Sequence, residues 1–248
     1  GIGFKITVAA EMATESAFNF NATYEMNFHA NGGVNRVWIY GNARVMSLPD
    51  KYALPETGTG KPNNGAPISA YISLEMNFNT NVLDGIVEMY ADFGNGAFRG
   101  TGPNGRLGSV AIHFANSGSY IKMGKPWMRD GSADQRLGLQ IAIPGLGDLA
   151  SIKMYLQIGS NIDPMGPIPA EIASLTGASQ VNTFNTGSWG GQVAMGNGFA
   201  FGAELNIGSR EYQFLIFTAG FQANVGFDLA LRNLGTGAVC ASSNQPVG

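Results

Sequence analysis

The stretch "AFNFNATYEMNFHANGG", residues 17–33, alternates residue by residue between apolar and polar side chains. Its even positions are apolar: Phe18, Phe20, Ala22, Tyr24, Met26, Phe28 and Ala30. The odd positions from Asn19 to His29 are polar. Successive side chains of a β-strand point to opposite faces of a sheet, so this period of two predicts a strand with one apolar face. We expect that face to be buried against protein, in a core formed by the chain itself.

The same alternation recurs over most of the chain. It covers residues 2–12, 34–47, 109–115, 119–124, 137–143, 151–158, 199–207 and 215–231. Gly- and Asn-rich turn signals separate many of these runs. The pattern predicts a mainly β fold, an antiparallel meander of long amphipathic strands that forms a sandwich-like or strongly curved sheet. The alternative fold is a transmembrane β-barrel, whose strands alternate in the same way.

An internal repeat indicates how the meander is organised. "YEMNFHAN" (24–31) returns as "LEMNFNTN" (74–81), and each copy is followed by a turn and a second apolar strand. We expect one large domain over residues 1–248, built from two related strand units at about 1–50 and 62–110 and a C-terminal β portion at 137–235. The only helix expected is a short one near 169–176. Residues 236–248 show no pattern and are expected to form a tail or linker.

Two observations count against the membrane alternative. The run from Leu215 to Leu231 is apolar at every odd position. As one strand it would be longer than the 9–11 residues that cross a bilayer, and it would span about 56 Å. It must otherwise be a hairpin. Aromatic residues are also spread along the strands, whereas two girdles are typical of membrane sheets.

Composition excludes several classes of function. Only 12% of the residues are charged, about half of the usual share of roughly 25%, and the formal net charge of −3 does not favour nucleic acid. The single cysteine, Cys240, rules out an internal disulfide, and two histidines do not predict a metal site. We find no pattern typical of a catalytic site or a cofactor-binding loop, so we expect neither catalysis nor a cofactor.

Two segments carry side chains that could contact a partner. "SYIKMGKPWMRDG" (119–131) combines Trp127 with Lys122 and Arg129, which is a composition suited to binding a glycan or a protein. The alternative is a strand end followed by an ordinary basic turn. "IDPMGPIPAEI" (162–172) contains Met165, Pro167 and Ile168, an apolar protrusion that either folds back on the sheet or contacts a partner.

The low charge and high Gly and Asn content resemble large bacterial cell-surface and secretion-linked proteins. We therefore expect a non-enzymatic structural or interaction module of a secreted, cell-surface or outer-membrane-associated assembly. An outer-membrane pore component and a glycan-binding or glycan-cleaving β-sandwich are the alternatives. Because the chain begins at Gly and its edges carry few charges, we expect a protein partner or the remainder of a longer precursor to pair with the sheet.

Overall fold

The computed structural model describes residues 2–12, 17–46, 66–127, 133–143, 147–164, 197–208, 212–214, 217–233 and 239–244. The strands in these ranges are β1 (Gly3–Met12), β2 (Phe18–Phe28), β3 (Val34–Val45), β4 (Ile68–Asn77), β5 (Val82–Phe93), β6 (Phe98–Gly100), β7 (Arg106–Ala115), β8 (Gly118–Met123), β9 (Leu137–Ile143), β10 (Gly147–Gly159), β11 (Asn197–Gly208), β12 (Tyr212–Phe214), β13 (Phe217–Ala219), β14 (Gln222–Asn233) and β15 (Val239–Asn244). A short 3-10 turn, η1 (Pro103–Gly105), precedes β7. The expected mainly β fold is confirmed.

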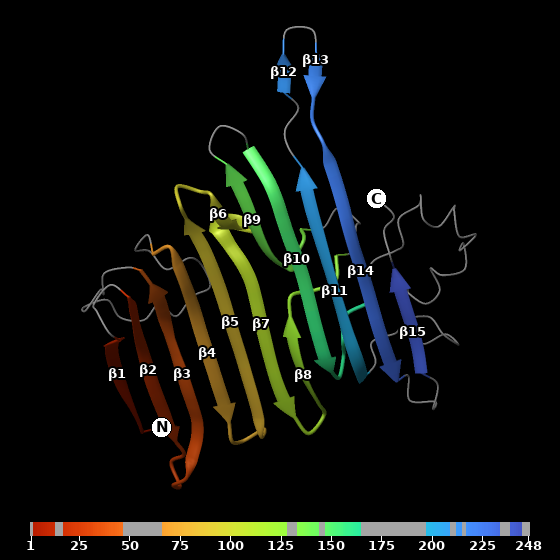
Figure 1. Ribbon diagram of the computed structural model, residues 1–248. Coiled ribbons are helices and arrows are strands. Elements are labelled where there is room, and N and C mark those ends of the chain that lie inside the picture. The colour runs from red at the N-terminus through yellow and green to blue at the C-terminus, as the bar shows by residue number, and fades with distance from the viewer. Residues whose placement is uncertain are drawn as a thin grey trace.

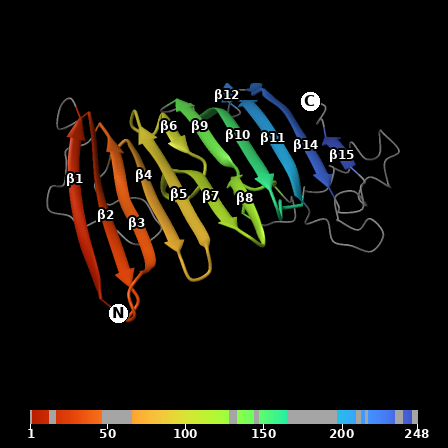
Figure 2. The same cartoon turned by 90° about the horizontal axis from the view of Figure 1, so that it is seen from below.

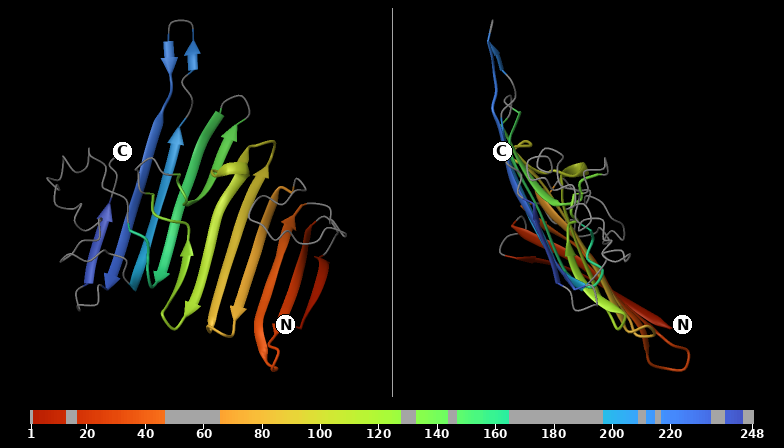
Figure 3. Two further views of the ribbon diagram at one scale, coloured as in Figure 1. Left: turned by 180° about the vertical axis from the view of Figure 1, so that it is seen from behind. Right: turned by 90° about the vertical axis from the view of Figure 1, so that its right-hand side faces the viewer.

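Thirteen of these strands form one sheet, in a single layer that extends across the molecule (Figures 1 and 2). The order is β1-β2-β3-β4-β5-β6-β9-β10-β11-β14-β15, with β7 and β8 filling the space between β5 and β10 below β6 and β9. All the strand pairs are antiparallel, as the meander predicts, and β12 and β13 form a separate hairpin. Seen nearly edge-on, the sheet is strongly twisted (Figure 3, right).

The sequence repeat places two equivalent strands on either side of β3. Glu25 of β2 and Glu75 of β4 are both register partners of Trp38 in β3. The "NGG" turn that joins β2 to β3 needs glycine, because Gly32 and Gly33 have φ values of 91° and 85°. Both units are therefore consecutive parts of one sheet.

Apolar side chains of neighbouring strands are aligned on the same face across the whole sheet. A single row of partners runs through Ile6, Tyr24, Ile39, Leu74, Gly85, Ile112, Ile121, Ile158, Phe199 and Leu231. We call the side of the sheet that carries this row the apolar face. The next row over holds Thr7, Thr23, Tyr40 and Ser73, and we call its side the polar face.

Burial of these faces is the reverse of our expectation. Apolar-face side chains such as Ile6 (52% exposed) and Phe20 (37%) are accessible, whereas polar-face Thr23 and Gln157 are fully buried at 0%. The prediction that the apolar face of 18–30 packs in a protein core is therefore wrong. Gln157 is buried because the described segments that cross the single-layer sheet lie on the polar face of β10, and Thr23 lies between its register partners Thr7 and Tyr40, with its hydroxyl bonded to that of Thr7.

Those covering segments follow β8 and β10. Gly124, just after β8, accepts a hydrogen bond from Gln157 Nε2 at 2.9 Å, so this segment lies over the polar face, the side shown in front in the left panel of Figure 3. After β10, the chain turns onto the same face and buries Ile162 against Tyr155, Ala200 and Ala230. A small apolar core therefore lies on the side of the sheet that is mostly polar.

The C-terminal expectations are resolved in part. The run 215–231 is not one continuous strand of about 56 Å, because it is divided between β13 and β14. β13 pairs with β12 as a hairpin. β15 pairs with β14 inside the segment 236–248, where we had expected a tail or linker, because backbone pairing does not require an alternating sequence. The helix expected at 169–176 falls outside the described residues. Within the described ranges, no helix is long and apolar enough to cross a bilayer.

Candidate functional site

The most buried ionic cluster lies on the polar face, where β10 and β11 meet the segment before β9. Arg136 immediately precedes β9, and its side chain is only 5% exposed. Its guanidinium donates to Glu204 Oε2 of β11 at 2.6 Å and to Asp134 Oδ2 at 2.9 Å. Lys153 of β10 donates to the same Asp134 oxygen at 3.0 Å. Two cations and two carboxylates are therefore paired, with no net charge.

This pairing determines the protonation of both carboxyl groups. Burial alone would raise the pKa of Asp134, but hydrogen bonds from Arg136 and Lys153 and the positive charge of Arg136 lower the pKa to about 2. Burial would also raise the pKa of Glu204, and the hydrogen bonds from Asn206 and Arg136 lower it overall. Both groups are therefore ionised near neutral pH, which is the state of a structural ion pair rather than of a general acid.

Amide and aromatic groups complete the cluster. Glu204 Oε1 accepts hydrogen bonds from Asn206 Nδ2 at 2.7 Å and from Asn224 Nδ2 of β14 at 3.1 Å. The Trp127 ring lies 5.2 Å from the Arg136 guanidinium carbon, a distance typical of cation–π contacts. The cluster therefore fastens the segments after β8 and before β9 to the polar face.

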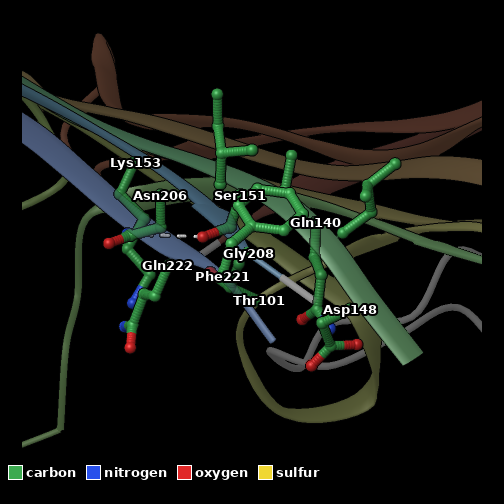
Figure 4. Close-up of a pocket in the computed structure, with 12 residues that line it drawn as sticks. Thr101, Gln140, Asp148, Ser151, Lys153, Asn206, Gly208, Phe221 and Gln222 are labelled. Carbon is green, nitrogen blue, oxygen red and sulfur yellow. Dashed lines mark hydrogen bonds between the residues drawn. The ribbon is translucent and has the colours of Figure 1, made fainter. Parts of the chain in front are cut away.

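An open groove of about 410 Å³ lies beside this cluster (Figure 4). Its lining residues are Thr101, Gln140, Asp148, Leu149, Ala150, Ser151, Lys153, Asn206, Ile207, Gly208, Phe221 and Gln222. Figure 4 shows Ser151 and Asn206 joined by a hydrogen bond, which the Asn206 amide donates. Hydroxyl, amide and lysine groups of this kind suit a small polar molecule or ordered water, and Lys153 is already paired with Asp134.

The lower part of the polar face holds further ion pairs. Arg36 of β3 lies between the two repeat-related acids, at 3.1 Å from Glu25 and 3.8 Å from Glu75. His113 Nδ1 lies 2.6 Å from Asp84 Oδ1 on the neighbouring strand. No group of three or more metal-binding side chains occurs in the part of the chain that the structure describes.

The structure gives different outcomes for the expected partner-contact residues. Trp127 stacks on Arg136, and Lys122 is largely buried, where it pairs with Asp163 at 3.0 Å. Both therefore take part in contacts within the chain. Arg129, Met165, Pro167 and Ile168 fall outside the described residues. Sequence analysis missed Arg136 and Glu204, which are 68 residues apart and share no motif.

No protein-family model, curated protein or solved structure matches this chain. The function must therefore be argued from the geometry of the sheet and its two faces.

Proposed function

We propose that this chain is a membrane-inserted β-sheet of the outer membrane, with a structural or pore-forming role and no catalytic activity. The apolar face contacts the hydrocarbon core of the bilayer, and the polar face borders a hydrated interior. The observation that carries the proposal is the reversed burial of the two faces. In a water-soluble sheet the apolar side chains are the ones withdrawn from solvent.

The size of the exposed apolar surface supports this proposal. Among the side chains that the structure describes, every large apolar one exposed within a strand lies on the apolar face: Phe4, Ile6, Val8, Phe20, Ile39, Phe114, Ile121, Ile143, Ile152, Met154, Ile158, Leu205, Ile207, Val225, Phe227 and Leu231. Full burial of one such side chain contributes about 1.5–3 kcal/mol. Soluble monomers rarely leave so large a continuous apolar surface in water, so a lipid or protein surface should cover it.

Strand length and aromatic positions favour lipid as the covering phase. The main strands of the sheet, such as β2 and β4, have 10–13 residues, close to the 9–11 tilted residues that cross a bilayer. From β2 to β7, apolar-face phenylalanines gather at strand ends, with Phe18 and Phe93 at one end and Phe28 and Phe114 at the other. This arrangement approximates two girdles over β2 to β7 only, because Tyr24 of β2, Phe201 of β11 and Phe227 of β14 lie near the middle of their strands.

The sheet needs a further strand to close in a bilayer. Eleven strands lie along the path from β1 to β15, and every neighbouring pair is antiparallel, so these two edge strands run in the same direction. They cannot pair with each other antiparallel. Unpaired edges are costly in hydrocarbon because no water satisfies their backbone groups. We therefore propose that another segment of a longer precursor or another chain pairs with the β1 edge.

Neighbouring positions on β10 provide a matched test of the lipid contact. Ser151 lies on the polar face and Ile152 on the apolar face. In a Cys240→Ser background, Ser151→Cys and Ile152→Cys would each be labelled with an environment-sensitive fluorophore, and the full chain reconstituted into phosphatidylcholine vesicles. We expect blue-shifted emission and strong quenching by acyl-chain spin labels at position 152 only.

Equal quenching at both positions, or a chain that stays monomeric in buffer and does not bind vesicles, would refute lipid contact. The apolar face would then have to be covered by protein, as in the structural module that the composition suggested.

A further inference from the structure

One buried cation on the polar face has no counter-charge among the described residues. Arg44, near the end of β3, is only 5% exposed, and no ion pair joins it to a carboxylate among the residues that the structure describes. Its Nε is fully enclosed without a hydrogen-bond partner. A guanidinium stays protonated in proteins, so Arg44 cannot avoid the cost of burial by losing its charge.

Neighbouring polar groups are unsatisfied at the same place. Asn42 is 3% exposed, and neither its Nδ2 nor its Oδ1 has a hydrogen-bond partner. Ser69 is the register partner of Arg44 on β4, and its buried Oγ also lacks a partner. Directly opposite residues have Cβ atoms about 4.5–5.5 Å apart, and alternate residues of one strand are about 7 Å apart. All three side chains therefore lie within reach of one small molecule.

A buried carboxylate in the register row of Asn42 is already paired with another arginine. Glu88 of β5 accepts hydrogen bonds from Arg106 at 2.7 Å and from the Tyr90 hydroxyl at 3.0 Å. Among the described groups there, Arg44 is therefore a buried cation beside a carboxylate that is already paired with another arginine. Buried polar atoms without partners are uncommon, and several in one place indicate a group that fills the site.

We infer that Arg44, Asn42 and Ser69 bind a small oxyanion, such as phosphate, sulfate or a carboxylate. Arginine donates two parallel hydrogen bonds to such a group, which matches its planar geometry and neutralises both charges. Asn42 Nδ2 and the Ser69 hydroxyl supply two further donors. Asn42 Oδ1 accepts from a water molecule carried with the anion. This inference does not depend on whether the apolar face contacts lipid.

Thermal unfolding of the full chain in detergent micelles tests the site, with inorganic phosphate as the probe and sodium chloride at equal ionic strength as the reference. We expect a saturable rise in the wild-type midpoint, roughly 5–10 °C at 100 times the dissociation constant. Arg44→Met should abolish the rise. Arg36→Met is the matched control, on the same strand and face but paired with Glu25, and should keep it.

The sign of the Arg44→Met effect without phosphate separates this site from an internal ion pair. If the buried charge is uncompensated in the empty protein, the variant should unfold at a higher temperature than the wild type. If a carboxylate of the chain itself neutralised Arg44, Arg44→Met would instead lower the midpoint.

Ser69→Ala provides a second measurement if Arg44→Met does not fold. It should weaken the phosphate response by several-fold, because one donor is lost. An absent response in the wild type, or an equal response in wild type and Arg44→Met, would overturn the inference.

Discussion

Placing arginine at two depths on β10 would show what covers the apolar face. Ile152 lies near the middle of the strand and Ile158 next to its end, and both are exposed on the apolar face, at 46% and 50%. At a bilayer midplane, arginine costs about 2–4 kcal/mol, whereas near the interface it costs about 0–1 kcal/mol. We therefore expect Ile152→Arg to lower the folding equilibrium constant roughly 30- to 900-fold, and Ile158→Arg to lower it less than about fivefold.

The alternatives predict different pairs of values. If water bathed the apolar face, both substitutions would stay within about 0.5 kcal/mol of the wild type. If a second protein layer covered it, both would be strongly destabilising, since depth would not matter. Ser151→Arg, on the polar face beside Ile152, controls for the effect of the larger side chain.

Reversible urea unfolding in phosphatidylcholine vesicles, followed by tryptophan fluorescence, gives the three free energies of unfolding. The reasoning is refuted if Ile152→Arg and Ile158→Arg shift the free energy of unfolding equally. It is also refuted if Ser151→Arg is as damaging as Ile152→Arg.

Three further predictions follow from the polar face and the open edge. The pKa of Asp134 is about 2 in the folded protein against a usual 3.8, so its ionised form adds roughly 2 kcal/mol to the free energy of unfolding above pH 4. Acid unfolding should show this contribution being lost as the pH falls from about 4 through 2, and Asp134→Asn should not show this loss. The double variant Glu25→Gln, Glu75→Gln should remain folded and lose at most about 1 kcal/mol, because its ion pairs are partly exposed; turnover of a glycosidase or esterase substrate panel by the wild type alone would contradict the proposed non-catalytic role. The Ile2 carbonyl accepts a hydrogen bond from the Phe28 amide of β2, so the backbone groups of odd residues in β1 point away from β2. Ala9→Pro should therefore leave the fold intact and reduce association measured by light scattering in detergent. Unchanged association would argue against pairing at this edge.

The buried ion cluster shows where sequence reasoning stops. Arg136 precedes a strand by one residue, and Glu204 occupies the polar phase of another, so each fits an ordinary solvated position. Strand pairing determines that they meet at 2.6 Å, because β10 lies between β9, which follows Arg136, and β11, which carries Glu204. Likewise, Trp127 and Lys122 form a dense group in the sequence, but each contacts a residue distant along the chain, respectively Arg136 and Asp163.

The sequence by itself determined the strands, their antiparallel order and the separation of apolar from polar side chains, because a period of two admits only one regular structure. It could not determine which of the two faces would be buried. The alternating pattern predicts that Phe20 and Asn21 point to opposite faces of the sheet, but it does not predict whether protein, lipid or water contacts each face. Tertiary structure decided this point on β10, β11 and β14, because the segments that cross the sheet after β8 and β10 lie on the polar face, where hydrogen bonds from Gln157 and Lys122 hold them. Those partners are set by where the chain passes in space, a property that local pattern does not encode.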